Sequence, residues 1–265
     1  MAVVTCISWT DHTYNRWIGC SHASPGCRIC YAEADQDHRR GRVEWGPAGT
    51  RITVSDHTVR QPLLWDAAAR RDGIRRRVFC SSLADVFDQH PTIRAAWKVG
   101  LWSMIRQTPH LDWLLLTKRP EWVAADVERF AGGTPPPNAW LGFSAENQSW
   151  FDRRWAIVRE LPFTVRFSSY EPALGPIRLH EEHRGRLHWM IYGGETSVRR
   201  NESRPADLQW ARDMREDCAM LNVAFWFKQT GNWIDGHWVG KTSATFGAAH
   251  NLLDGVVVQQ LPSRS

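Results

Sequence analysis

The chain has 265 residues, of which 43% are hydrophobic and 23% charged, which is the composition of a globular protein with one large core. Its net charge of +5 and pI near 9.1 make it mildly basic. No apolar run approaches the roughly eighteen residues that cross a bilayer, and the first residues lack the basic and apolar regions of a signal peptide. These features argue against a membrane or secreted protein, and we expect a cytoplasmic protein with reduced thiols.

Strand-like and helix-like segments alternate along most of the chain. The predicted strands, which are short and rich in apolar residues, are residues 3–9, 77–80, 113–116, 139–143, 164–167, 187–192 and 223–227. Helical periodicity is found at residues 31–42, from Pro91, from Pro120, over 149–161 and after Pro205. Residues 43–62 contain glycines and prolines and are predicted to be irregular.

A strand followed by a helix, repeated six or seven times, predicts an α/β fold: a full or partial (β/α) TIM-like barrel of six to seven parallel strands. A doubly wound open sheet is the alternative, although neither G-x-G-x-x-G after the first strand nor a Walker lysine loop is present. We expect residues 1–230 to form the barrel and residues 231–265 to form a C-terminal cap or edge of the same domain.

Three of the six cysteines, Cys20, Cys27 and Cys30, fall within eleven residues with the spacing C-x6-C-x2-C. We refer to residues 20–30, which follow the first predicted strand, as the cysteine loop. Three thiolates on one loop can hold an iron–sulfur cluster whose fourth iron stays open. A structural zinc site is a second interpretation, and free thiols or a local disulfide are a third. The residues that could complete a zinc site are Cys6, His12, His22 and His38.

Polar or ionisable residues follow nearly every predicted strand at its carboxyl end. They are Ser81, Ser82, Asp85, Lys118, Arg119, Ser144, Glu146, Asn147, Glu171, Gly193, Gly194, Glu195 and Lys228. Each one has an ordinary explanation as a cap, turn or solvated residue. In a barrel, however, these ends share one mouth, which is where such folds place their chemistry. The glycine pair before Glu195 would let a ligand approach the backbone while the carboxylate receives a cation, and the two lysines could bind a carboxylate or phosphate.

Arginines are clustered in two parts of the chain, at Arg39, Arg40 and Arg42 and at Arg70, Arg71, Arg75, Arg76 and Arg77. Such clusters can contact a phosphate backbone, or they can be solvated faces of helices and loops. Sixteen tryptophans are present, and those on loops could stack on nucleic-acid bases.

The three-cysteine loop and the residues at the strand ends resemble the radical S-adenosylmethionine superfamily. More closely, the chain is similar over most of residues 8–231 to an uncharacterised, largely phage-encoded family with a three-cysteine motif, which is itself distantly similar to spore photoproduct lyase. The motifs that carry the resemblance are Trp9-Thr…Asn15, Gly19-Cys20-x6-Cys27-x2-Cys30-Tyr31-Ala-Glu33, Gln61-Pro-Leu63, Ser82-x2-Asp85-x-Phe87, Leu116-Thr-Lys-Arg-Pro120, Trp140-Leu-Gly-x-Ser144-x-Glu146-Asn147, Glu171-Pro-x-Leu-Gly175, Gly193-Gly-Glu195 and Phe227-Lys-Gln229.

The resemblance implies a [4Fe-4S] cluster on the three cysteines and a partial barrel of the radical S-adenosylmethionine type. The open iron would bind S-adenosylmethionine, and an external one-electron reductant would drive its cleavage to a 5′-deoxyadenosyl radical that abstracts a substrate hydrogen. We expect Glu171, Lys118 and Asp85 to act on the substrate. The residues expected to bind the cofactor are Tyr31, Ser82, Asp85, Lys118, Ser144, Glu146, Asn147, Gly193, Gly194, Glu195 and Lys228.

Three departures from the superfamily pattern leave open which carboxylate would bind the methionine ammonium. The first cysteine gap is six residues rather than three, and Ile29 rather than an aromatic precedes Cys30. Gly-Gly-Glu follows the sixth predicted strand rather than the second, where Ser81-Ser82-x2-Asp85 stands instead. After Glu195 the chain continues with Thr196-Ser197, whereas the similar family continues with Ser-Gly.

The leading hypothesis is an enzyme of isomerase or lyase type that modifies or rearranges a nucleic-acid base, in phage DNA hypermodification and therefore in the host cytoplasm. A DNA repair lyase is a variant of it. One alternative is a zinc-stabilised nucleic-acid-binding accessory protein without redox chemistry. Another is a radical enzyme acting on a small metabolite, in which case the arginines would be surface charge.

Overall fold

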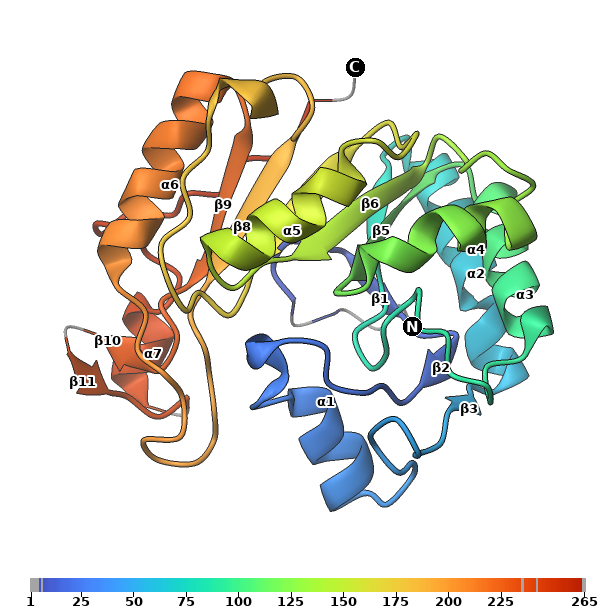
Figure 1. The fold of residues 1–265 in the computed structure, drawn as a ribbon, viewed down its shortest axis with the longest axis horizontal. Helices are drawn as coiled ribbons and strands as arrows, with labels where there is room; N and C mark the ends of the chain where they lie inside the picture. The colour runs from blue at the N-terminus through green and yellow to red at the C-terminus, as the bar shows by residue number, and fades with distance from the viewer. Residues whose placement is uncertain (1–4, 6, 235, 242, 264–265) are drawn as a thin grey trace. The chain divides into compact units, whose positions relative to one another are not determined.

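The computed structural model describes residues 5, 7–234, 236–241 and 243–263, and Figure 1 shows the path of the chain. By their contacts, the residues divide into two compact units. Unit 1 comprises residues 1–23, 30–142 and 161–164, and unit 2 comprises residues 24–29, 143–160 and 165–265. The middle of the cysteine loop therefore belongs to unit 2, and its two ends belong to unit 1.

Seven parallel strands form the main sheet, in the order β1-β4-β5-β6-β7-β8-β9. Their bounds are β1 His12–Tyr14, β4 Arg76–Cys80, β5 Leu111–Thr117, β6 Ala139–Ser144, β7 Arg166–Tyr170, β8 Trp189–Gly193 and β9 Ala224–Gln229. The spatial order follows the chain order without a reversal, which distinguishes a partial (β/α) barrel from a doubly wound sheet. The predicted fold class is thus confirmed.

Unit 1 contains β1, β4 and β5, which pair in register through His12↔Val78 and Val78↔Trp113. Every residue of β5 except Leu116 is buried, as expected for a strand covered on both faces. Its helices are α1 Tyr31–Glu33, which continues as a π-helix over Ala34–Arg39, α2 Asp56–Asp72, α3 Ala95–Gln107 and α4 Val123–Phe130. β2 Trp17–Ile18, which precedes the cysteine loop, forms a short antiparallel pair with β3 Ile52–Thr53, which follows it.

Unit 2 contains β7, β8 and β9, which pair through Phe167↔Trp189 and Trp189↔Ala224. Its helices are α5 Gln148–Val158, α6 Leu208–Leu221 and α7 Ala244–Ala249, and β10 Trp233–Ile234 pairs with β11 His237–Trp238. Arg178 makes a two-pronged ion pair with Asp217, which ties the loop after β7 to α6. The last described residues run beside β9, where Phe227 N donates to Val258 O at 2.8 Å.

Two predicted segments differ from the structure. Residues 3, 4 and 6 of the predicted first strand lie outside the described residues, and residues 5 and 7–9 form no strand. The first strand of the sheet is β1, whose composition is polar but whose His12 and Tyr14 are buried against neighbouring elements.

Residues 43–62 were predicted to be irregular, which is wrong from residue 56 onward because α2 begins there. Ser55 caps this helix by accepting a hydrogen bond from Thr58 N, and Gly73 ends it in the left-handed region with a φ of 68°. Pro62 lies inside the helix, where it removes one backbone hydrogen bond without ending the helix.

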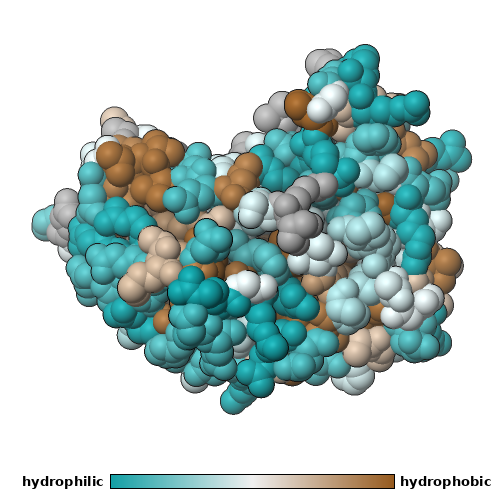
Figure 2. Space-filling view, turned by 90° about the horizontal axis from the view of Figure 1, so that it is seen from above, coloured by the Kyte–Doolittle hydropathy of each residue, from teal (hydrophilic) through white to brown (hydrophobic). Residues whose placement is uncertain are grey.

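No helix in the described part of the chain is both long enough and apolar enough to cross a membrane. Figure 2 shows one face of the molecule, on which hydrophilic residues predominate and hydrophobic ones lie in separate patches. This pattern agrees with the scattered charge of the sequence.

A buried ion pair joins α3 to α4: Lys98 Nζ contacts Asp126, and Trp102 Nε1 donates to the same carboxylate at 2.9 Å. We expect Asp126→Ala to lower the free energy of unfolding by about 3–5 kcal/mol, because the substitution leaves the lysine charge buried without its partner. Urea denaturation measures the change. The matched control is Asp152→Ala on the exposed side of α5, for which we expect a loss below about 1 kcal/mol, and equal losses would contradict this assignment.

Candidate functional site

The three thiols of the cysteine loop are only partly buried. Cys20 follows β2, Cys27 ends a short 3-10 turn over Pro25–Cys27, and Cys30 is the residue at which α1 begins. The turn forms because Pro25 fixes the backbone at its start, and Cys27 N donates to Ser24 O at 2.9 Å. Two thiols thus lie at ends of short helical segments and one at the end of a strand pair.

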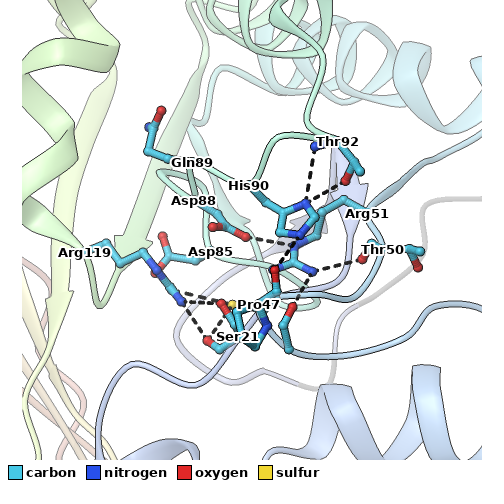
Figure 3. A network of polar contacts seen from close by, with 12 residues as sticks. Ser21, Pro47, Thr50, Arg51, Asp85, Asp88, Gln89, His90, Thr92 and Arg119 are labelled. Carbon is cyan, nitrogen blue, oxygen red and sulfur yellow. Dashed lines mark hydrogen bonds and ion pairs between the residues drawn. The ribbon is translucent and has the colours of Figure 1, made fainter.

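Arg119, which follows β5, holds the start of the cysteine loop in unit 1 (Figure 3). Its Nη1 donates to Cys20 Sγ at 3.6 Å, and its Nη2 donates to Ser21 O at 2.7 Å and to Ser21 Oγ at 3.1 Å. Its side chain is only 12% exposed. The guanidinium therefore forms hydrogen bonds with both the Cys20 sulfur and the backbone of the loop.

Asp85 orients this arginine through one carboxylate oxygen and is itself held through both. Its Oδ1 accepts from Phe87 N at 3.0 Å and from Thr117 Oγ1 at 2.7 Å, and its Oδ2 accepts from Lys118 N at 2.9 Å and Arg119 Nη1 at 3.0 Å. With four protein donors and 5% exposure, this carboxylate supports the loop. The predicted catalytic partner Lys118 meets Asp85 through its backbone nitrogen.

A second set of contacts holds the backbone beneath Cys20, also visible in Figure 3. Gly46 N donates to Cys20 O at 2.9 Å, and the buried Arg51 donates to Asp88 at 2.9 Å and to Thr50 O at 3.0 Å. Gly19 has a φ of +111°, and a Cβ there would lie 2.5 Å from Thr50 O, so glycine is required at this close approach.

Burial and, after it, the charge of Asp85 raise the pKa of the Cys20 thiol to about 12, against the opposing effect of Arg119. The thiol is therefore protonated at neutral pH unless a metal displaces the proton. Arg119 is the cation placed to stabilise the resulting thiolate.

Tyr31 and Ser82, two predicted cofactor-binding residues, are brought together in unit 1. The Tyr31 hydroxyl donates to Ser82 O at 2.6 Å, and Asn15 Nδ2 donates to Ser82 Oγ at 3.0 Å. The tyrosine is 59% exposed, so its ring remains accessible to a ligand.

In unit 2, Glu146 is completely buried and supports the middle of the cysteine loop. Ser24 Oγ donates to its Oε1, and Arg154 Nη1 donates to its Oε2 at 3.1 Å and to Ser144 O at 2.8 Å. A Cβ on Gly26 would lie 2.5 Å from the Glu146 carboxylate, so the loop packs directly on this side chain.

Asn147, the neighbour of Glu146, caps a helix in the structure. Its Oδ1 accepts from Trp150 N at 3.2 Å and from Ser149 Oγ at 2.9 Å, which is the geometry of the first turn of α5. Its predicted role in cofactor binding remains a prediction.

Glu195 makes an ion pair with Arg204, which also reaches the cysteine loop. Arg204 contacts both carboxylate oxygens, one of them through Nε at 2.9 Å, and donates from Nη2 to Pro25 O at 3.0 Å. Arg28, between Cys27 and Cys30, donates to Glu202 O at 3.0 Å. The loop after β8 is thereby joined to the middle of the cysteine loop at two points.

Glu171 is the most accessible of the four predicted carboxylates, with 15% of its side chain exposed against 6%, 0% and 4% for Asp85, Glu146 and Glu195. Lys228 Nζ donates to its Oε1 at 2.7 Å. A Cβ on Gly193 would lie 2.3 Å from the same oxygen, so this glycine makes room for the pair.

All four predicted acidic residues thus pair with a cation. Of the four cationic partners, only Arg119 and Lys228 were among the strand-end residues expected from the sequence. The pairs are Asp85–Arg119, Glu146–Arg154, Glu195–Arg204 and Glu171–Lys228. Arg154 and Arg204 were missed because they lie eight and nine residues beyond their partners, inside α5 and at the end of a loop. An acid followed at such a distance by an arginine is a weak signal in a sequence.

The chemistry of the donor set fits an iron–sulfur cluster: three cysteines lie on one loop, and Cys20 lies beside a cation that stabilises a thiolate. Among the residues that the structure describes, no three histidine, cysteine, aspartate or glutamate side chains are arranged to hold a metal ion. The cluster on Cys20, Cys27 and Cys30 therefore stays a prediction.

The chain belongs to the family described as "Protein of unknown function (DUF5131)", which matches residues 4–262. No curated protein matches it in sequence.

Solved structures that are similar to the chain are mutants of spore photoproduct lyase. A cysteine-to-serine mutant is 14% identical with a TM-score of 0.47, over 74% of this chain and 58% of that one. A double mutant with bound AdoMet and dinucleoside spore photoproduct is 13% identical with a TM-score of 0.48, over 84% and 65%. The chain thus spans less than two thirds of the length of these proteins. None reaches 25% identity or a TM-score of 0.5, so the functional proposal rests on this chain's own residues.

Gly194, predicted to let a ligand approach the backbone, is instead approached by the protein itself. A Cβ there would lie 2.0 Å from Thr230 O, which is backbone and cannot move aside as a side chain can. We expect Gly194→Ala to lower the melting temperature by roughly 5 °C or more, through overpacking worth about 1–3 kcal/mol.

The control for this substitution is Gly100→Ala within α3, where the nearest atom would lie at 3.7 Å. Alanine favours a helix, so this variant is expected to melt at the wild-type temperature or above it. Two variants that melt alike would contradict the close packing at Gly194. Differential scanning calorimetry provides the comparison.

Proposed function

We propose that this member of the DUF5131 family is a radical S-adenosylmethionine enzyme that acts on a nucleic-acid base. The observation that carries the proposal is the anchoring of the cysteine loop. Arg119, fixed by Asp85, grips Cys20 and Ser21, and Arg204, fixed by Glu195, grips Pro25. Burying such ion pairs costs desolvation energy, and a loop that carries three thiols and is held in this way is better explained as a ligand set than as a surface turn.

Cys20, Cys27 and Cys30 would hold the [4Fe-4S] cluster, which would supply the electron that cleaves S-adenosylmethionine. The other residues would bind and orient. Glu171 is the carboxylate best placed to meet a cationic group, because it is the most accessible of the four, and Lys228 Nζ holds its Oε1 at 2.7 Å. The exposed ring of Tyr31, held by Ser82, would supply an apolar surface beside the loop.

The loop after β8 is the reason to propose a nucleic acid as the substrate. The two ends of this loop are held by the Glu195–Arg204 ion pair and by Trp233 Nε1, which donates to Ser203 O at 2.7 Å. Its tip carries Val198, which is 86% exposed, and Arg199, whose side chain is 79% exposed although its Nη1 lies 3.6 Å from Glu202, followed by the exposed Arg200. Exposed arginines on an anchored loop are suited to phosphate contacts.

The arginine clusters that the sequence suggested are less available. Arg75, Arg76 and Arg77 pair with Asp112, Asp72 and Asp11, and both Arg39 and Arg40 pair with Asp35. Much of their charge is therefore matched within the protein. The finer assignment, an isomerase or lyase step in phage DNA hypermodification within the host cytoplasm, follows only from the motif resemblance.

The cluster assignment is tested with protein purified without oxygen and reconstituted with iron and sulfide. We expect about four irons per chain and a brown colour, and we expect Cys27→Ala to bind far less iron while remaining folded, because the residue lies on a loop. Cys218→Ala, which removes a buried thiol inside α6, is the matched control and should keep the full iron content. One tightly held zinc in place of iron would instead support the accessory-protein alternative.

Nucleic-acid binding is tested by fluorescence anisotropy with single- and double-stranded DNA oligonucleotides at several salt concentrations. The double variant Arg199→Gln/Arg200→Gln is expected to bind more weakly and to reduce the slope of log affinity against log salt by about two, since each arginine would contact one phosphate.

Arg184→Gln is the control, because this exposed arginine precedes β8 at the end opposite to the loop. It should leave both affinity and slope unchanged. Wild-type affinity that is independent of salt would exclude phosphate contact and favour a small-metabolite substrate.

A further inference from the structure

Two guanidinium nitrogens of Arg119 make four hydrogen bonds between them, and each nitrogen makes two. Nη1 bridges Cys20 Sγ and Asp85 Oδ2, and Nη2 donates to the carbonyl and the hydroxyl of Ser21. A lysine could supply the charge but not this forked geometry. Arg119 therefore fixes the position of Cys20 Sγ relative to the Asp85 carboxylate.

The carboxylate in turn cannot turn away from the arginine. Three of its four donors belong to the ends of strands or the segments after them. The Thr117 hydroxyl and the Lys118 backbone nitrogen lie at the end of β5, and the Phe87 backbone nitrogen lies in the segment after β4. Arg119 N also donates to Thr117 Oγ1 at 2.8 Å, which closes the arrangement. The guanidinium is thus preorganised before any ligand arrives.

A cationic N–H group near a cysteine sulfur affects the redox chemistry of a cluster on that sulfur. Reduction adds one electron to the cluster and increases the negative charge shared with its thiolates. Hydrogen bonds to the sulfurs and nearby positive charge stabilise the reduced form and raise the reduction potential. At 3.6 Å from Cys20 Sγ, Arg119 is within the range of such a bond.

We propose that Arg119 is a positioning residue that holds Cys20 for the cluster and raises the reduction potential of that cluster. This inference rests on the proposed function. It assigns Asp85 the role of fixing the arginine. An external one-electron reductant would then reduce the cluster more readily than if the same thiol lay beside a neutral residue.

The test is a redox titration of the reconstituted protein with dithionite and mediators, followed by EPR. Arg119→Gln removes the charge and is expected to shift the midpoint potential to a more negative value. At a fixed solution potential, the ratio of reduced to oxidised cluster should fall roughly tenfold, the effect of one hydrogen bond to a charged group. Arg119→Lys keeps the charge without the fork and should give an intermediate potential.

Arg75→Gln is the matched control, because Arg75 also pairs with a buried aspartate, Asp112 at 2.8 Å, but at the opposite end of β5. Its potential should equal that of the wild type. A wild-type potential in Arg119→Gln at full iron content would overturn the proposal.

If Arg119→Gln fails to retain iron, the midpoint potential of Arg119→Lys is the test. A potential that differs from the wild type supports the proposal, and an unchanged potential overturns it. Wild-type protein that binds no iron would refute the proposed function, and with it this assignment. A normal cluster with an unmoved potential in both variants would refute the role of Arg119 alone. The two failures are therefore distinguishable.

Discussion

The carboxylate of Asp85 is the contact on which the described geometry of the first cysteine depends. Four protein donors occupy its two oxygens, so its position is set by the end of β5 and by the turn at Phe87. Arg119, which is fixed by this carboxylate, in turn holds Cys20 and Ser21 by hydrogen bonds. A polar anchor of this kind is a means by which a surface loop can hold a ligand set in place.

The same device recurs in unit 2, where Glu146 with Arg154 and Glu195 with Arg204 support the middle of the cysteine loop. These acids are buried and matched by arginines, which leaves Glu171 as the more accessible carboxylate at a strand end. Three of these acids thus have structural partners in or beside the cysteine loop, and Glu171 is the one assigned to the proposed chemistry. The two glycines before Glu195 are explained by close packing, since the Glu171 carboxylate and the Thr230 carbonyl occupy the space that side chains at Gly193 and Gly194 would fill.

Much of the fold could be predicted from the sequence, because six of the seven strands are apolar runs whose periodicity is a local property. The exceptions were β1, where burial of His12 and Tyr14 depends on neighbouring elements, and α2, where Pro62 lies inside a helix. For the site, the sequence located the acids at the strand ends. It could not show which were satisfied internally, because an ion pair such as Asp85–Arg119 spans residues that only the fold brings together.

The central claim is that the three cysteines hold a cluster with an open iron. The most direct test is the EPR spectrum of the reconstituted, reduced wild-type protein before and after addition of S-adenosylmethionine. A cluster signal that changes on adding S-adenosylmethionine is the predicted result, because the cofactor would bind the open iron. A signal that does not change, or a colourless protein that contains zinc, would contradict the claim.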